Sequence, residues 1–166
     1  ITFGNVFLFM KEDIFDRHEP SAHQDCEQEL ALFDKALKLA KQKTLELETK
    51  ALSLISEADA SIFNVHLMFL EDKAVLDQVR KEVVSGWSLD TAIINVYQQY
   101  EKRFSQFSDQ TFRDKSYDLK DVMLRIVESA HILKNAENEE QVFASSASKL
   151  VLVARELLPS DLIRMP

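Results

Sequence analysis

Apolar residues recur at helical spacing over most of the chain. From Ala22 to about Ser56 no glycine or proline interrupts the pattern, and one apolar stripe continues along it. Its first members lie three or four residues apart: Leu30, Phe33, Leu37 and Ala40. Leu45, Leu52 and Ile55 continue it further on. Such steps place side chains on one side of a helix, so the pattern predicts one long helix, as half of an antiparallel hairpin or of a coiled coil.

Four shorter helices are expected after it, each preceded by a residue that can cap a helix N-terminus. The expected helices cover residues 57–71, 73–85, 89–107 and 109–133, and the capping residues are Ser56, Asp72, Ser88 and Ser108. Gly86 fits the position just beyond the end of the second of these helices.

The two ends of the chain are short, apolar and β-prone. Ile1–Met10 is predicted to form a buried strand or a tight hairpin, and Lys149–Arg155 a second strand. Lys11–Ser21 is charged and is interpreted as a connector. Pro159 indicates the start of another helix, which the chain does not finish.

Two strands that flank one helical block indicate a mainly α fold, a helical bundle with hairpin character inserted between two short strands of an incomplete α/β domain. The expected parts are residues 1–21 (strand and connector), 22–141 (helical subdomain) and 142–166 (returning strand and truncated helix). The chain begins at Ile1 without Met, which indicates a piece of a larger protein, although a processed secreted protein would look the same.

The composition agrees with long helices, and the net charge restricts the classes of molecule that the chain can bind. Only 2 of the 166 residues are glycine and 3 are proline, and chains rich in turns need more of both. The formal net charge of −8 disfavours a nucleic-acid partner and suits a protein with a basic or mixed surface. The single cysteine, Cys26, indicates a reducing cytoplasm, and no apolar run approaches the ~20 residues of a membrane span.

No complete catalytic site is expected. Phosphate-binding loops, nucleophile elbows and the HExxH zinc motif are absent from the sequence. His18 and His23 would allow a metal site in the connector, but a solvated loop is favoured. His66 is interpreted as a structural histidine, His131 as a residue that interacts with a helix dipole, and Cys26 as a passive thiol.

Residues 61–79 contain more apolar side chains than one buried stripe needs. Val65, Met68 and Phe69 are therefore candidates for an exposed apolar patch. Their apolar neighbours are expected in the core: Phe63, Leu67 and Leu70. Charged residues would stand at the edge of the patch: Glu57, Glu71 and Asp72. An apolar centre with a charged rim is typical of a partner site, and the alternative is that a neighbouring helix covers these residues completely.

Four segments of the chain match family motifs in order and at similar spacing. They are Ile1–Val6, Ile62–Asp72, Asp114–Ile126 and Leu150–Asp161, similar to GIAFGKA, IFEAHLMLLEDPEL, ERAADVRDIGRRLL and VILVAxDLTPSE. Nearly the whole chain thus resembles the N-terminal region of Enzyme I of the bacterial phosphotransferase system, the phosphoenolpyruvate–protein phosphotransferase family. In that family a helical subdomain, inserted into an α/β phosphohistidine domain, docks the small carrier protein HPr.

The resemblance implies a set of partner-binding residues by matched position: Glu57, Ser61, Val65, Met68, Phe69, Val75, Phe112 and Lys115. The chain departs from the family pattern in four places. Ala58 and Ala74 stand where acids are common, Lys115 stands where arginine is common, and Phe69 replaces the usual leucine. The surface that would bind the carrier therefore has fewer charged groups than is usual in the family. The expected partner is HPr or a variant such as the nitrogen-regulatory carrier.

The family's phosphorylated histidine lies in a GGxTSHxAI segment that the chain does not contain. The resemblance therefore implies a fragment with no catalytic residue and no cofactor, and a parent transferase of the cytoplasm that uses Mg²⁺ and serves sugar transport. The fragment is expected to be monomeric and the parent dimeric. A nitrogen-regulatory or dihydroxyacetone-kinase-linked phosphotransferase is an alternative. A structural coiled coil is another, and it predicts that residues 22–56 pair between chains and that Val65, Met68 and Phe69 are buried.

Overall fold

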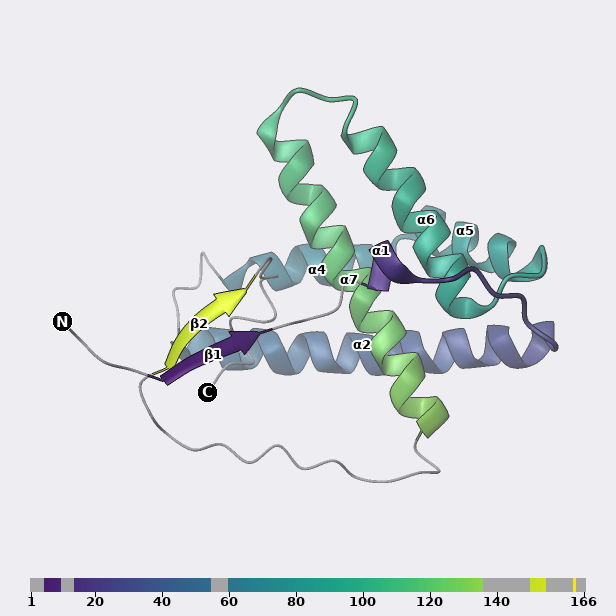
Figure 1. Ribbon diagram of the computed structural model, residues 1–166, viewed down its shortest axis with the longest axis horizontal. Helices are drawn as coiled ribbons and strands as arrows, with labels where there is room; N and C mark the ends of the chain where they lie inside the picture. Colours follow the sequence, from purple (N-terminus) through teal and green to yellow (C-terminus); the bar gives the residue numbers. More distant parts are fainter. Residues whose placement is uncertain (1–4, 10–13, 55–59, 136–149, 155–162, 164–166) are drawn as a thin grey trace.

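The computed structural model describes residues 5–9, 14–54, 60–135, 150–154 and 163 (Figure 1). Their helices and strands are β1 (Asn5–Phe9), α1 (Ile14–Arg17), α2 (Cys26–Leu54), α4 (Ile62–Glu71), α5 (Lys73–Val84), α6 (Leu89–Phe104), α7 (Gln110–Asn135) and β2 (Leu150–Ala154). The expected start of a helix at Pro159 and the cap at Ser56 lie outside the described residues. Every described helix is too short or too polar to cross a membrane.

The bundle is organised around the crossing of its two longest helices. Figure 1 shows α7 running across α2, with α6 beside α7 as the other half of an antiparallel hairpin and α4 along the direction of α2. The first half of the apolar stripe predicted for α2 is buried or half-buried within this chain, at Leu30, Phe33, Leu37 and Ala40. This half packs with buried side chains of α6 and α7, which include Ile93, Val96, Val122, Met123 and Ile126. The second half of the prediction is wrong, because Leu45 and Leu52 are each 50% exposed and the residues buried there are Thr44, Leu47 and Ala51. The pairing of residues 22–56 between chains, which the coiled-coil alternative requires, stays a prediction.

A buried polar triad fixes the register of α2 against α7. The guanidinium of Arg125 is 1% exposed, and it donates to Thr44 Oγ1 at 2.7 Å and to Asp121 Oδ1 at 2.8 Å. Thr44 in turn donates its hydroxyl proton to the carbonyl of Ala40 at 2.8 Å. Buried polar groups are tolerated when they are paired, so the triad permits the crossing only where these partners meet.

The helix ends confirm two of the predicted caps and correct a third. Asp72 Oδ1 accepts from the amides of Ala74 and Val75 at 2.8 and 3.1 Å, and Ser88 Oγ accepts from that of Thr91 at 3.4 Å. Gly86 has φ +112°, as the predicted position beyond a helix end requires. The cap of α7 is not Ser108 but the next residue, Asp109, whose Oδ1 accepts from the Thr111 amide at 3.0 Å. The preceding helix, α6, ends at Phe104, three residues earlier than expected.

The connector is more ordered than the sequence indicates. It contains α1, and Phe15 inserts into the core with its ring centroid 4.5 Å from that of Tyr97. His18 Nε2 lies 2.7 Å from Thr91 Oγ1, and His23 Nε2 donates to the carbonyl of Val83 at 2.7 Å. The residues between these histidines are exposed, as in a solvated loop, but both histidines are half-buried and each joins the connector to a different helix.

The start of α2 also differs from the prediction. The helix begins at Cys26 rather than at Ala22, because Asp25 Oδ1 accepts from the amide of Gln28 at 3.1 Å and caps it there. Ala22 instead forms an isolated antiparallel bridge with Trp87. The apolar stripe of the helix is unaffected by this later start.

The two predicted strands pair with each other. β1 and β2 are parallel, with Asn5 opposite Leu150 and Phe9 opposite Ala154. Parallel neighbours need a long crossover, and here the whole helical block supplies it. The fold class expected from the sequence, a helical bundle between two short strands, is therefore confirmed. The domain boundaries at residues 21 and 141 stay a prediction.

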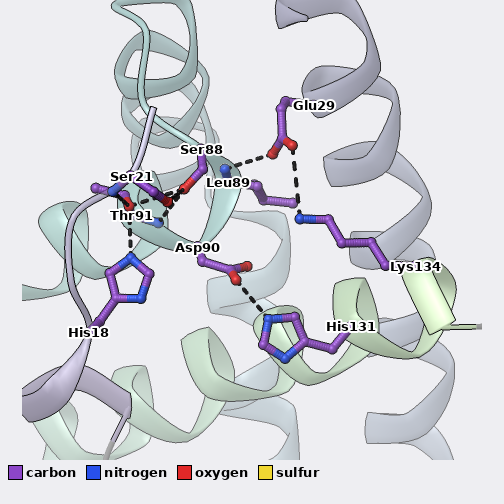
Figure 2. Close-up of polar contacts among 9 residues, drawn as sticks. All are labelled: His18, Ser21, Glu29, Ser88, Leu89, Asp90, Thr91, His131 and Lys134. Atoms are coloured by element: carbon purple, nitrogen blue, oxygen red, sulfur yellow. Dashed lines mark hydrogen bonds and ion pairs between the residues drawn. The ribbon is translucent and has the colours of Figure 1, made fainter. Parts of the chain in front are cut away.

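A second polar cluster joins α2, α6 and α7 (Figure 2). His131 Nε2 lies 2.7 Å from Asp90 Oδ2. Glu29 accepts from the amide of Leu89 at 2.7 Å, and its other carboxylate oxygen is 3.8 Å from Lys134 Nζ. The partner of His131 is thus a carboxylate on another helix, which the interpretation as a helix-dipole contact did not foresee.

This cluster predicts a pH-dependent stability. The hydrogen bond to Asp90 raises the pKa of His131 above 6.5, an effect that partial burial opposes. Burial by itself raises the pKa of Asp90, but the hydrogen bond and charge of His131 outweigh it and hold that pKa below 3.8. The contribution of the His131 pairing to the free energy of unfolding is complete below pH 6.5 and is lost as the pH rises through the pKa of His131 in the folded chain. The Asp90 contribution is present above pH 3.8 and is lost as the pH falls through its folded pKa.

Urea unfolding of the wild type and of His131→Gln between pH 5 and 9 measures this contribution. The wild type should be more stable than the variant near pH 5.5, and the difference should shrink towards pH 9. Because the His131 side chain is 44% exposed, we expect a change of less than about 1 kcal/mol. A difference that stays constant across this pH range would contradict the proposed pairing.

Candidate docking surface

One face of α4 is buried and the opposite face is exposed. Phe63, His66 and Leu70 lie at steps of three and four residues and are each at most 1% exposed, because this face packs on α2 and α7. On the other side Met68 is 70% exposed, while Val65 and Phe69 are half-buried. The prediction that Phe63 and Leu70 fill the core is confirmed. The alternative that a neighbouring helix covers the whole patch is wrong.

The other residues predicted to bind a partner differ in their exposure to solvent. Ser61 is exposed just before α4, and Lys115 is exposed on α7 beside the half-buried Phe112, with its Nζ 5.7 Å from the centre of that ring. Val75 is only 3% exposed, so its side chain belongs to the core rather than to the surface. Glu57 lies outside the described residues.

A contact between α4 and α7 places the two parts of the surface next to each other. His66 Nε2 on α4 lies 3.7 Å from Asp118 Oδ1 on α7. Lys115 precedes Asp118 by three residues and therefore lies on the same face of α7. Phe112 is a further three residues towards the start of the helix. The exposed side chains of α4 and the first turns of α7 thus border one surface, which we call the docking surface: Ser61, Val65, Met68, Phe69, Phe112 and Lys115.

Acidic groups stand at the end of α4 beside this surface. Glu71 is exposed, and its Oε1 lies 3.3 Å from Lys41 Nζ on α2. Asp72 follows it, with one carboxylate oxygen engaged in capping α5. The rim is therefore less negative than the sequence suggests, because Lys41 compensates one charge. The sequence gives no signal for this ion pair, whose members are 30 residues apart.

The described residues offer little for catalysis. No group of three or more metal-ligating side chains comes together among them. A hollow of about 750 Å³ between α2 and α7 is lined by charged residues of both signs, such as Lys43, Glu46 and Glu128, and by Ile132. Such a lining lacks the few convergent polar groups in an apolar cavity that mark most small-molecule sites.

His66 is an unusual element of this site, because its ring is fully buried and neither nitrogen has a hydrogen-bond partner among the described residues. An unpaired buried polar group costs about 1–3 kcal/mol. We therefore expect His66→Leu to leave the free energy of unfolding unchanged or to raise it by about 1 kcal/mol. His66→Ala should lower it by about 2–4 kcal/mol, because it leaves a cavity.

Chemical denaturation of the two variants tests this expectation, and His131→Leu is the matched control. That substitution removes a histidine that does have a carboxylate partner, so it should destabilise the chain at pH 5.5. A His66→Leu variant that loses more than about 1.5 kcal/mol would contradict the account, since it would mean that the imidazole is well paired in solution.

Comparisons with known proteins show the family of the chain. The family model described as "PEP-utilising enzyme, N-terminal" matches residues 1–115. The chain is 24% identical over 163 residues to a phosphoenolpyruvate-protein phosphotransferase of Staphylococcus aureus, and 27% identical over 141 residues to that of Mycoplasma capricolum. These matches cover 97% and 82% of this chain but only 27% and 23% of the relatives, so the chain spans about a quarter of their length.

Two solved structures share the fold. The solution structure of an Enzyme I protein (nEIt) superposes with a TM-score of 0.73 at 27% identity, and covers 98% of this chain and 64% of that one. A structure described as the N-terminal domain of Enzyme 1 - Nitrogen gives a TM-score of 0.72 with the same coverage, and its 19% identity shows the fold alone. The resemblance recognised from four sequence segments is confirmed.

Proposed function

Since this chain belongs to the N-terminal family of PEP-utilising enzymes, we propose that it is the carrier-docking part of a phosphoenolpyruvate–protein phosphotransferase. It binds an HPr-like phosphocarrier on the docking surface. The observation that carries the proposal is the exposure of Met68 at the centre of a half-buried apolar surface that two helices share. Apolar centres of this kind, surrounded by charge, are where protein partners gain most of their binding energy.

The role of docking is to bring two histidines together. In the parent protein the phosphoryl group passes from phosphoenolpyruvate to a histidine outside this chain, and from there to the histidine of the carrier. Mg²⁺ serves the first step in the parent. A carrier held on the docking surface stays near the phosphorylated histidine, which replaces a bimolecular encounter by a local one. The parent acts in the cytoplasm, and this fragment is a monomer.

Charge supports a carrier with a basic edge. The chain carries a net charge of −8, and Glu71 and Asp72 lie at one end of the docking surface. A basic carrier approaches such a surface faster and in a preferred orientation. The nitrogen-regulatory carrier remains the alternative partner, and the experiment below distinguishes it because both carriers are titrated.

Binding of HPr-type and nitrogen-regulatory carriers from the same organism can be followed by NMR titration of the 166-residue chain. We expect shifts along α4 and at the start of α7. Met68→Ala should weaken binding about 10-fold, as removal of a central apolar anchor does. Ile132→Ala is the control, because Ile132 is 47% exposed and lies four helical turns beyond Asp118, about 20 Å along α7.

The proposal fails if neither carrier shifts any resonance at high concentration. It also fails if the Met68→Ala and Ile132→Ala variants bind a carrier equally well, because binding would then occur on another face.

A further inference from the structure

The connector is attached to the start of α6 through the hydroxyl group of one buried threonine. Thr91 is 1% exposed, and its Oγ1 accepts from the amide of Ser21 at 3.0 Å and from Ser88 Oγ at 3.0 Å. His18 Nε2 lies 2.7 Å from the same oxygen. Figure 2 shows these side chains gathered at one end of α6, where the His18 ring reaches them from the connector. We call the four residues the connector latch: His18, Ser21, Ser88 and Thr91.

The count of donors and acceptors at Thr91 fixes the protonation state of His18. A threonine hydroxyl has two lone pairs and one hydrogen. Both lone pairs of Thr91 Oγ1 are occupied, by the hydrogens of the Ser21 amide and the Ser88 hydroxyl. Its own hydrogen therefore points at His18 Nε2, which accepts it at 2.7 Å. Only a neutral imidazole that carries its proton on Nδ1 can accept there.

A second proton on His18 would break this arrangement. It would turn Nε2 into a donor, and Thr91 Oγ1 would then face three donors with two lone pairs. Either the imidazole leaves Thr91 or a donor stays unpaired in a largely buried place, and both results are unfavourable. The attachment of the connector to α6 thus depends on a group that exchanges a proton close to neutral pH.

The charges around the connector latch also oppose a second cation. Burial raises the pKa of Asp90 on α6, and the hydrogen bond and charge of His131, followed by the charges of Lys134 and His18, lower it below 3.8. His131 Nε2 lies 2.7 Å from Asp90 Oδ2, and Lys134 Nζ lies 3.8 Å from Glu29 Oε1 on α2. These two carboxylates already have two cations as partners, so a charged His18 would add an unmatched positive charge.

The chain is held independently on both sides of the connector latch. Phe15 is buried in the core, and His23 Nε2 donates to the carbonyl of Val83 on α5 at 2.7 Å. A proton on His23 leaves that bond intact, because the charged ring still carries a hydrogen on Nε2. Loss of the His18 contact should therefore open residues 18–22 locally and leave the bundle folded.

We propose that His18 is a proton-controlled latch: the neutral imidazole holds the connector on α6, and its protonation in mildly acidic solution releases residues 18–22. These residues lie between β1 and α2, so their release lets the strand pair and the bundle move more independently as the pH falls. The inference does not rest on the proposed function, because it involves no residue of the docking surface. The two histidines at this end of α6 have opposite requirements, since His131 pairs best when charged and His18 only when neutral.

Amide exchange of the 166-residue chain, measured by NMR at pH 7.5 and pH 5.5, tests the release. The amides of Ser21 and Ser88 report on the connector latch, because they donate to Thr91 Oγ1 and to the Ser21 carbonyl. We expect their protection factors to fall about 5-fold to 10-fold at the lower pH. The amide of Val75, which Asp72 caps on α5, should keep its protection. Equal protection of the Ser21 and Ser88 amides at both pH values would overturn the inference.

Matched variants identify the histidine responsible. His18→Gln keeps an acceptor near the position of Nε2 but cannot take up a proton, so it should retain high protection at both pH values. Thr91→Val keeps the shape of the side chain without the hydroxyl, and it should show low protection at both. His23→Gln is the control and should behave like the wild type. A pH dependence that survives in His18→Gln, or that disappears in His23→Gln, would rule out the latch.

The protonation state of His18 has a spectroscopic readout. The ¹⁵N chemical shifts of its ring should show the proton on Nδ1 at pH 7.5. A proton on Nε2 would mean that the hydroxyls of Thr91 and Ser88 point the other way, which contradicts the latch. His131→Gln should move the release to a higher pH, because Asp90 is then free to stabilise a charged His18. Release at the same pH as in the wild type would contradict the competition between the two histidines.

Discussion

The position of every other helix depends on how α7 is held across α2. Arg125 lies in that crossing almost without access to water, and its guanidinium needs both Thr44 and Asp121 as partners. A sliding of one helix along the other by a single turn would break the hydrogen bond from Arg125 to Thr44, while the ion pair with Asp121 on the same helix would stay. Losing that hydrogen bond to a buried charge costs about 1–3 kcal/mol. Apolar packing alone, with the small buried side chains of Ala36 and Ala40 on α2, would tolerate such a shift more easily.

The fixed crossing divides α7 into two parts with different tasks. Beyond Arg125 the helix packs on α2 and α6 and contributes the cluster of His131 and Asp90. Before it, α4 lies against α7 at Asp118, and the first turns of α7 extend with α6 into the hairpin. The surface between α4 and the hairpin exists because the same helix is anchored at one end and projects at the other. Recognition can therefore use a rigid surface whose shape does not depend on loops.

The sequence predicts the elements well and their contacts poorly. Helical spacing and the absence of glycine are local properties, and so are the caps at Asp72 and Ser88, so each could be recognised without knowing the fold. Ser108 and Asp109 are neighbours of equal capping ability, and spacing alone cannot choose between them. The burial of Phe15 could not be predicted, because a single apolar residue in a charged connector forms no periodic pattern. The triad of Arg125 joins residues 81 positions apart, which no local pattern encodes.

In the candidate site, too, local features could be predicted from the sequence and contacts between elements could not. The exposure of Met68 and the burial of Phe63 and Leu70 follow from the period of α4. The burial of Val75 does not, because Asp72 interrupts the helix and resets the orientation of the residues after it. The aromatic residues of the α6–α7 hairpin are visible in the sequence only as four rings three to five residues apart, a spacing equally typical of a buried stripe: Tyr100, Phe104, Phe107 and Phe112. Of these only Phe107 is exposed, because it lies in the turn between the two helices.

The central claim is that a phosphocarrier sits on the surface shared by α4 and α7. A spin label tests it most directly, because it reports proximity rather than affinity. The label is attached to Asn64→Cys, an exposed residue of α4 next to the docking surface, in a Cys26→Ser background. As a control it is attached to Ile132→Cys in the same background, and each chain is added to ¹⁵N-labelled HPr-type carrier. The account predicts that the label at position 64 broadens one contiguous face of the carrier and that the label at position 132 does not. Broadening from position 132 alone, or equally from both, would place the carrier elsewhere and contradict the claim.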